Sequence, residues 1–282
     1  MDSLISGIKH NWHFAFFSIL ALLLLFTALS APWIAPYHPE TAEMKNAFLP
    51  PSDGHWFGTD KLGRDCFSRV IYGARNSLSS VLILVCLVFS VGTSLGIISG
   101  YYGGKIDTVI MRLADIMISF PGIILAIAMA GIMGGSMLNA ILALLSATWP
   151  KYARLSRSLV LKIKQKEFIE AAHINGGTQF HILIRHVLPN ILPLLVITAA
   201  SDIGGLMLEL AGLSFLGFGI QPPAPEWGAM INEGRQQLQT APWLMIYPGL
   251  AIFTTVVIFN LWGDSLRDVL DPHSVHQERI SS

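Results

Sequence analysis

The segment EAAHINGGTQFHILIRHVLPN, residues Glu170–Asn190, is polar, basic and glycine-bearing, although long apolar runs surround it. Of the 282 residues, 52% are hydrophobic and 13% are charged, and the mean hydropathy is +0.56. This apolar content is above that of an ordinary soluble domain. The sequence therefore predicts an all-α polytopic membrane protein in which this segment lies outside the lipid.

Six apolar runs are predicted to be transmembrane helices, because about 20 apolar residues are enough to cross about 30 Å of hydrocarbon. The fourth run is short and is expected to include flanking residues. The first is interpreted as a retained anchor; the alternative is a secretory signal cleaved after the small residues 28–31, whose apolar run would be shorter. The runs are Phe14–Ala35, Leu78–Gly100, about 116–134, Met137–Trp149, about 191–215, and Trp243–Trp262.

The distribution of lysine and arginine predicts that both termini face the cytoplasm. Six spans place both termini on one side, and basic residues accumulate in cytoplasmic loops. With the termini inside, twelve basic residues face the cytoplasm and six face outward. The inner set is Lys9, Lys105, Arg112, Lys151, Arg154, Arg157, Lys162, Lys164, Lys166, Arg185, Arg267 and Arg279; the outer set is Lys45, Lys61, Arg64, Arg69, Arg75 and Arg235.

In this topology residues 151–189 form a cytoplasmic loop between the fourth and fifth spans. The loop has apolar residues at helical spacing up to about Ile174, then the turn sequence Asn175–Thr178, then a second short helix up to Val187. Glycine readily takes the conformation that ends a helix. A short helix-turn-helix of this kind cannot bury its apolar side alone, so we expect a cytoplasmic protein to dock on it.

The spacing within this loop resembles the EAA loop of permease subunits in binding-protein-dependent ABC importers. The matching residues are Glu170, Ala171, Ala172, Gly176, Leu188 and Pro189; His186 stands where the family usually has an aliphatic residue. The resemblance implies the type I permease fold, and it implies that the loop couples a cytoplasmic ATPase to the membrane helices.

A second block resembles the dipeptide, oligopeptide and nickel branch of these permeases. It lies before the second span and contains Gly58, Thr59, Asp60, Gly63, Arg64, Asp65, Ser68 and Arg69. The resemblance covers nearly the whole chain and is closest to the C-type subunit of the nickel importers, with the peptide permeases as the alternative. It implies a homologous second permease, one or two kinds of ATPase subunit, an extracytoplasmic binding protein and a location in the bacterial inner membrane.

The expected organisation has three parts. Residues 1–76 form the anchor helix and an extracytoplasmic loop, residues 77–272 form the core transmembrane domain, and residues 273–282 form a cytoplasmic tail. Within the second span, Gly92, Gly96 and Gly100 recur every four residues and predict close packing against another helix.

Two carboxylates in the fifth span are candidate residues of the translocation path. Asp202 and Glu209 are seven residues apart and share a helix face. A carboxylate in a membrane is costly unless it faces protein or water, so we expect either the path wall or a hydrogen bond to a neighbouring helix. The histidines and the two cysteines have no spacing typical of a metal site or a disulfide.

No nucleotide site is predicted in this chain, because it has no phosphate-binding G-x-x-x-x-G-K-[ST] sequence. Magnesium and ATP are expected to bind the partner ATPases, so this chain itself carries no cofactor and catalyses no reaction. Membrane lipid is the expected surroundings, and no nucleic-acid partner is indicated. A secondary transporter that relays protons through Asp202 and Glu209 is the alternative from another class.

Overall fold

A computed structural model describes residues 12–270. The predicted tail, residues 273–282, lies outside the described residues. Within them the chain is helical, and its only β contacts are two isolated bridges. The helices are α2 (Trp12–Leu29), α3 (Ala31–Ile34), α4 (Cys66–Tyr102), α5 (Gly104–Ile118), α6 (Gly122–Met133), α7 (Met137–Lys164), α8 (Glu167–Ile174), α9 (Gln179–Ile182), α10 (Leu188–Phe215), α11 (Trp227–Gly234) and α12 (Trp243–Leu270), with short turns at Met44–Asn46, Leu183–Val187 and Arg235–Gln237.

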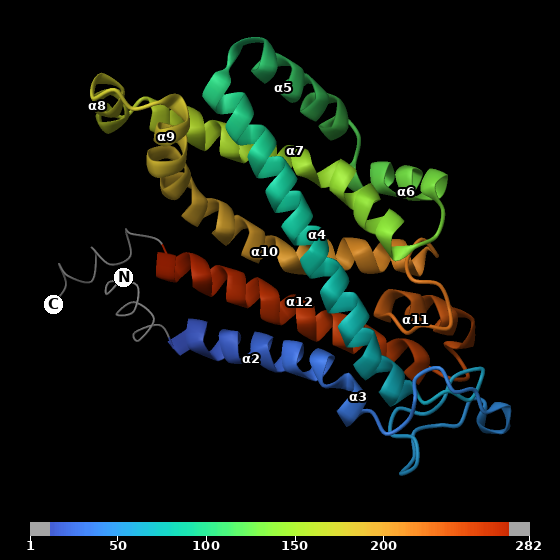
Figure 1. The fold of residues 1–282 in the computed structure, drawn as a ribbon. Helices are drawn as coiled ribbons and strands as arrows, with labels where there is room; N and C mark the ends of the chain where they lie inside the picture. The colour runs from blue at the N-terminus through green and yellow to red at the C-terminus, as the bar shows by residue number, and fades with distance from the viewer. Residues whose placement is uncertain (1–11, 271–282) are drawn as a thin grey trace.

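The long helices run between two distinct ends of the molecule (Figure 1). The start of α2, the end of α12 and the α8–α9 region lie at one end, while α3, α11 and the loop before α4 lie at the other. The described ends of the chain, at Trp12 and Leu270, thus lie on the same side of the molecule as the α8–α9 region. That this side is the cytoplasm stays a prediction.

Four described helices are long and apolar enough to span a membrane, namely α2, α4, the continuous helix Gln179–Phe215 and α12. The predicted third span is instead a bent pair, because α5 and α6 meet at 92°. Pro121, immediately before α6, has no backbone N–H to continue α5. Counting the pair as one span gives five, so the predicted six is not confirmed.

The predicted fourth span, Met137–Trp149, is only the first half of α7. This helix continues to Lys164 and contains five basic residues in its second half. Its 28 residues correspond to a length of about 42 Å. The predicted loop at 151–189 is therefore shorter: α7 includes its first part, and the α8 residues predicted to continue the same helix form a separate one after a break at Gln165 and Lys166.

The predicted glycine stripe lies at the crossing of α4 and α7. A Cβ atom at Gly92 would lie 2.6 Å from the carbonyl oxygen of Trp149, and one at Gly100 would lie 2.9 Å from that of Arg157. Between them, Gly96 faces Ala153 and Ser156. The absence of side chains at these positions lets the two helices pack backbone against backbone.

The second span also begins earlier than predicted. Asp65 caps α4: its carboxylate accepts hydrogen bonds from the Ser68 backbone nitrogen at 2.8 Å and the Ser68 hydroxyl at 2.7 Å. Residue 76, the predicted end of the first part of the chain, consequently falls inside α4. The outer loop and the core are joined by one continuous helix.

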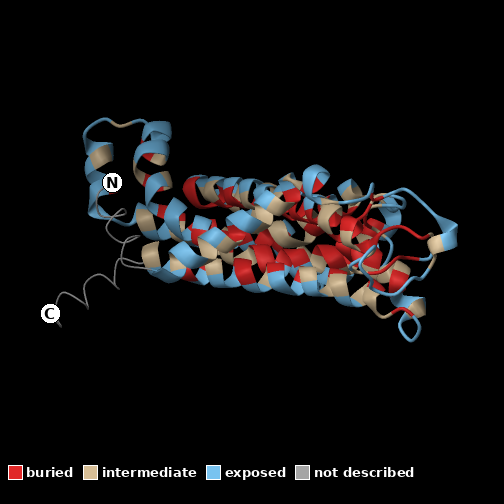
Figure 2. Cartoon of the chain, turned by 90° about the horizontal axis from the view of Figure 1, so that it is seen from below, coloured by how far each residue is buried: buried red, intermediate tan, exposed pale blue. Residues whose placement is uncertain are grey.

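Burial is concentrated within the helix bundle and toward the α11 end (Figure 2). At the opposite end a helical hairpin projects from the bundle with mostly exposed residues. This hairpin is the α8–α9 region, so the segment that differs most from its neighbours in composition also projects from the fold.

Candidate functional site: the inner loop, the outer cap and a mid-span ion pair

The inner loop, defined as residues 165–187, turns at a glycine pair. The Gly177 N–H donates to the Ala172 carbonyl and the Gly176 N–H to the His173 carbonyl, both at 3.0 Å. This is the Schellman arrangement, and Gly176 adopts its left-handed conformation with φ of +79°. A Cβ at Gly176 would meet no atom within 4 Å, whereas one at Gly177 would lie 2.8 Å from the Ala172 oxygen. Gly176 is thus needed for its backbone angle and Gly177 for space.

The predicted coupling residues lie on and after α8. Glu170, Ala171 and Gly176 are exposed and Ala172 is partly buried. Ile169, between Phe168 and Glu170, points inward and is buried. The helix therefore anchors itself through one apolar residue and presents the Glu170 side to the surroundings.

The chain returns to the bundle without a break. The Thr178 hydroxyl caps α9 by accepting from the His181 backbone nitrogen at 3.3 Å. A π-helical turn then joins α9 to α10, and the Leu188 N–H donates to the Leu183 carbonyl. Pro189 has no N–H for the regular ladder, which accounts for the change of register. The predicted second short helix of the loop and the predicted fifth span, about 191–215, are instead one continuous helix, Gln179–Phe215.

The inner loop has a buried apolar side and an exposed one. Its buried side chains join a cluster with the inner ends of α4, α7 and α10, comprising Tyr101, Val160, Ile169, Ile182, Val187, Ile191 and Leu195. On the opposite side Ile174 is 79% exposed and Phe180 is 72% exposed. Apolar side chains this exposed, in a segment outside the spans, form a surface suited to another protein.

Tyr101, at the end of α4, connects the inner loop to two other helices. Its hydroxyl donates to the Gln179 carbonyl at 2.8 Å. Its own carbonyl accepts from the Lys164 ammonium at 2.7 Å, and this ammonium lies 5.3 Å from the Tyr101 ring centre. The start of α9, the end of α4 and the end of α7 are therefore linked at one residue.

Two ion pairs hold α5 against α7 near the same end. Arg157 makes a bidentate contact with Asp107, at 2.5 and 2.6 Å, and Ser99 donates to the same carboxylate. Further along, Arg154 lies 2.5 Å from Asp115. Bidentate geometry fixes orientation as well as distance. Arg154 and Arg157, predicted to lie on a helix of the cytoplasmic loop, lie on α7 and have carboxylate partners on α5.

The outer cap, defined as residues 36–65 together with 216–242, is held by a buried ion network. Arg64 contacts Asp60 at 2.6 Å and Glu233 of α11 at 2.7 Å. Arg69 reaches the same Glu233 oxygen at 3.2 Å. The two cations and two carboxylates balance, and all four side chains are largely buried.

Most of the predicted outer motif serves this network or the turn beside it. Thr59 is buried, and its hydroxyl donates to the Asn46 carbonyl at 2.5 Å and accepts from the Leu49 backbone at 2.8 Å. Gly58 and Gly63 have positive φ values of 69° and 72°. The motif therefore builds the cap, and its charged side chains do not form the presented surface.

A second contact joins the cap to α4. Glu226 caps α11 by accepting from the backbone nitrogens of Gly228 at 3.0 Å and Ala229 at 2.9 Å, and it also accepts from the Ser77 hydroxyl at 3.0 Å. The Trp227 indole donates to the Val70 carbonyl at 2.8 Å. The outer loop after α10 is thereby tied to the first part of α4.

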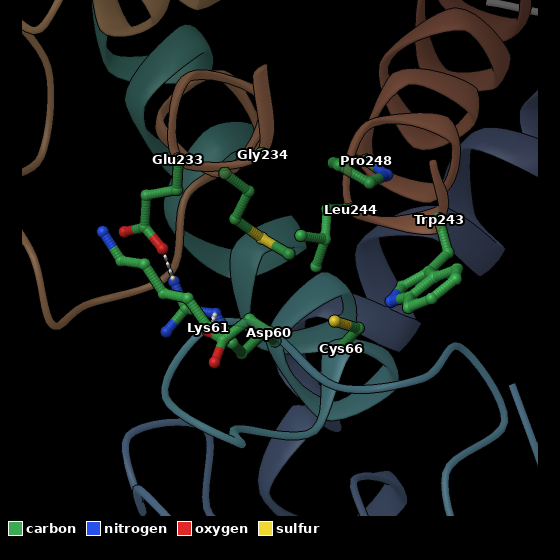
Figure 3. A pocket seen from close by; sticks show the side chains of 10 residues that line it. Asp60, Lys61, Cys66, Glu233, Gly234, Trp243, Leu244 and Pro248 are labelled. Atoms are coloured by element: carbon green, nitrogen blue, oxygen red, sulfur yellow. Dashed lines mark hydrogen bonds and ion pairs between the residues drawn. The ribbon is translucent and has the colours of Figure 1, made fainter. Parts of the chain in front are cut away.

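Figure 3 shows the small cavity beside this network, where Asp60 of the loop and Glu233 of α11 lie near Cys66 and Trp243. Its volume is about 20 Å³. Small-molecule sites are commonly about 300–1,000 Å³. This cavity is too small for a transported solute, and the ion network around it is structural.

The predicted path residues Asp202 and Glu209 lie on α10, and Asp202 is paired. The Lys151 ammonium lies 2.7 Å from both Asp202 oxygens, and the Tyr152 hydroxyl donates to one of them at 2.9 Å. Lys151 was expected in a cytoplasmic loop, but it stands near the middle of α7 opposite the middle of α10. Its position after Pro150, at the end of an apolar run, concealed this from sequence reasoning.

Three other residues of these sites were given no role by the sequence analysis: Tyr101, Glu226 and Glu233. Each acts through a partner far away in the chain, and none stands in a distinctive spacing with it. Glu226 alone had a usable signal, since an acidic residue before an apolar stretch is typical of a helix start. Among residues 12–270, no group of three or more His, Cys, Asp or Glu side chains is placed to hold a metal ion.

Comparison with solved structures supports the fold. The inward-facing MetNI methionine ABC transporter contains a chain that superposes with a TM-score of 0.58, at 21% identity, over 72% of this chain and 97% of that one. At this identity the likeness concerns the fold alone.

The curated proteins similar to this chain include permeases for nickel, D,D-dipeptides and glutathione. The nickel transport system permease NikC of Escherichia coli is 41% identical over 268 residues, which are 95% of this chain and 97% of NikC. The probable D,D-dipeptide permease DdpC of the same organism is 41% identical, over 90% of this chain and 86% of its own. The glutathione permease GsiD of Pectobacterium atrosepticum is 45% identical, over 90% and 85%.

Residues 92–275 match the family described as the binding-protein-dependent transport system inner membrane component. This range includes the inner loop, α7 and α10. The family match, the relatives and the helical architecture agree with one another. The chain is an inner-membrane permease component of an ABC importer and belongs to the binding-protein-dependent transport family.

Proposed function

We propose that this chain forms half of the translocation path of an ATP-driven importer for nickel or a nickel chelate, in complex with a homologous second permease. The observation in favour of nickel is length: this chain and NikC match nearly end to end, over 95% and 97% of their residues. The matches to DdpC and GsiD cover 86% and 85% of those proteins.

Import of a short peptide is the second candidate. The 45% identity to a glutathione permease is higher than the 41% identity to NikC. The same helices would then line a path for a solute with peptide amino and carboxylate groups.

The proposal that ATP drives transport rests on the structure of the inner loop. It projects from the bundle and exposes Ile174 and Phe180 beside Glu170. One or two kinds of cytoplasmic ATPase would dock on this apolar surface, while an extracytoplasmic binding protein would deliver the solute to the outer cap. Docking at α8 would move Tyr101, and hence α4 and α7, through the hydrogen bond at Gln179.

Uptake in cells tests the proposed function. Radioactive nickel and a labelled dipeptide are supplied side by side to cells that lack only this gene and to the same cells with the gene restored. We expect nickel uptake alone to depend on the gene. Dependence of dipeptide uptake alone would establish the second candidate, and uptake that fails with collapse of the proton gradient but survives ATP depletion would indicate a secondary transporter.

A substitution at Gly176 tests the coupling role. Gly176→Leu forces a side chain into the left-handed conformation, which costs about 1–2 kcal/mol for most residues. We expect uptake per transporter to fall about tenfold while the amount in the membrane is unchanged. Because space around Gly176 is open, the backbone angle is the cause.

Gly176→Asn is the matched control, since asparagine visits the left-handed region more readily. It should retain most of the uptake. Uptake within twofold of the native level for Gly176→Leu would contradict the assigned role of the turn.

A further inference from the structure

The ion pair between Lys151 and Asp202 lies far from both ends of the helices that carry it. Lys151 is near the middle of α7, and Asp202 is near the middle of α10. The pair is nevertheless open to the surroundings of the chain, because the Lys151 side chain is 55% exposed and that of Asp202 is 19% exposed. A charged pair beside membrane-spanning helices is costly wherever it meets hydrocarbon. The face that carries it must therefore be turned toward water or protein.

The neighbouring surface of α10 has the same character. Asp202, Gly205, Glu209 and Gly212 are spaced three, four and three residues apart and so lie along one helix face. A Cβ at Gly205 or Gly212 would meet no atom within 4 Å. Glu209 is partly exposed, about two turns nearer the outer cap than Asp202. One further carboxylate, Glu209, thus lies on the cap side of the ion pair, whereas Gly212 beyond it lines an apolar groove between α10 and α12.

The contrast with α2 indicates which kind of surface this is. The exposed side chains of α2 are large and apolar, as expected for lipid contact, and include Phe16, Ile19, Leu22, Leu23 and Phe26. The polar face, defined as Lys151, Asp202, Gly205 and Glu209, carries charged groups and an exposed glycine where α2 carries such side chains. It suits a water-filled passage.

We propose that the polar face is a binding site in the translocation path for a solute that carries a carboxylate beside a cationic centre. The ion pair opens as the solute arrives: Lys151 binds the carboxylate and Asp202 binds the cationic centre, while Glu209 attracts that centre on the cap side. The centre is either the ammonium group of a zwitterionic peptide or a metal ion held by a carboxylate chelator. This inference rests on the proposed importer function and specifies the chemical class of its solute.

A leucine at Gly205 tests whether the face lines the path. The side chain enters open space, so the complete importer should assemble and unfold at the native temperature. We expect the uptake rate to fall at least about tenfold because the leucine narrows the passage. Gly249→Leu is the matched control, since Gly249 is a helical glycine of α12 with equally open space and lies among apolar side chains. Native uptake by Gly205→Leu would overturn the proposal, and so would loss of assembly, which would make the face a subunit interface.

Exchange of the two charges tests whether uptake requires the positive charge on α7 and the negative charge on α10. Lys151→Asp combined with Asp202→Lys preserves the ion pair but reverses it. We expect thermal unfolding and basal ATP hydrolysis to return to native values while uptake remains at least about tenfold below native. Recovery of uptake would overturn the proposal, because the pair would then only hold α7 against α10. The equivalent exchange of Arg154 with Asp115, another exposed pair on α7, should leave uptake unchanged.

Glu209→Gln removes a single charge from the polar face. Its effect on uptake tests the site independently of the double variant in which the two charges of the ion pair are exchanged. We expect the uptake rate at saturating binding protein to fall about tenfold, the usual effect of losing one charge-assisted hydrogen bond. Unchanged uptake would remove Glu209 from the site.

Uptake of three probes into vesicles that contain the complete importer distinguishes the two candidate solutes, a peptide and a metal chelate. The probes are nickel chloride alone, nickel chloride with excess glycine, and labelled dialanine. Sensitivity of dialanine uptake to the charge exchange would identify a peptide, and sensitivity of nickel uptake with glycine would identify a chelate. Equal uptake of nickel with and without glycine would contradict the need for a carboxylate. Failure of the native importer to take up any probe would overturn the proposed function as well, whereas recovery by the exchanged pair overturns this inference alone.

Discussion

Replacing Arg64 with alanine is expected to open the outer cap and to destabilise the protein by about 3–5 kcal/mol, the usual cost of breaking a buried ion pair on one side. Arg64 is 1% exposed and lies 2.6 Å from Asp60 and 2.7 Å from Glu233. Without it, Arg69 alone faces two carboxylates, and one negative charge is left uncompensated in a buried site. Separation and hydration of Asp60 and Glu233 then lower the electrostatic free energy of the two carboxylates, which favours the open cap.

The rate at which a reagent labels the Cys66 thiol measures how often the cap opens. Cys66 is 3% exposed, in the cavity beside the network, and the chain has two cysteines. In a Cys86→Ser background, a thiol reagent should label Cys66 at least about a hundredfold faster in Arg64→Ala than in the parent, because the loss of stability raises the open population accordingly.

Lys61→Ala is the matched control, since Lys61 is an exposed cation of the same loop. It should leave the labelling rate unchanged. Native labelling kinetics in the Arg64 variant would mean that the network contributes nothing to the closed cap.

Valine at Gly96 is expected to prevent the close approach of α4 and α7. Its Cβ would overlap the Ala153 carbonyl and the Ser156 hydroxyl, and the Ala153 backbone cannot rotate away as a side chain can. The helices must separate, and overpacking of this kind costs about 3 kcal/mol. The loss is larger still if the contacts at Gly92 and Gly100 fail with it.

The measurement is thermal unfolding of the purified permease in detergent, together with the fraction that elutes as dispersed protein. Gly249→Val is the control, because it places the same residue in open space on α12. We expect the Gly96 variant to lose most of its dispersed fraction and the control to retain it. Equal unfolding temperatures would show that the two helices tolerate a wider separation.

The sequence predicted most of the helical spans where the residues were uniformly apolar, but not the bend between α5 and α6 in the predicted third span. It was less accurate where polar residues are buried. The second span begins at Cys66 because Arg69 and Ser77 have partners in the cap, and those partners are invisible to hydropathy. The fourth span was ended at Trp149 because Lys151 follows, although Asp202 pairs with that lysine.

In the candidate sites, too, features set by the local sequence were predictable and contacts between distant segments were not. The turn at Gly176 was predictable, since local backbone preference decides it. Asp202 and Glu209 were predictable as one helix face, but the pairing of Asp202 with Lys151 was not. The outer motif was recognised, yet its structural role depends on Glu233, which stands 169 residues after Arg64. Contacts between distant segments follow from the three-dimensional fold, and residue spacing does not encode them.

The span between Arg64 and Glu233 also sets an order for biogenesis. During synthesis the cap loop emerges early with Arg64 and its first carboxylate, Asp60, whereas the second carboxylate, Glu233, arrives only with α11, after most of the membrane helices. Until then the two arginines must remain hydrated or held by other factors, because burial without Glu233 is unfavourable. Closure of the cap is therefore a late step of folding, and a chain truncated before α11 would leave Arg69 without its closest carboxylate and the cap loop open to proteases.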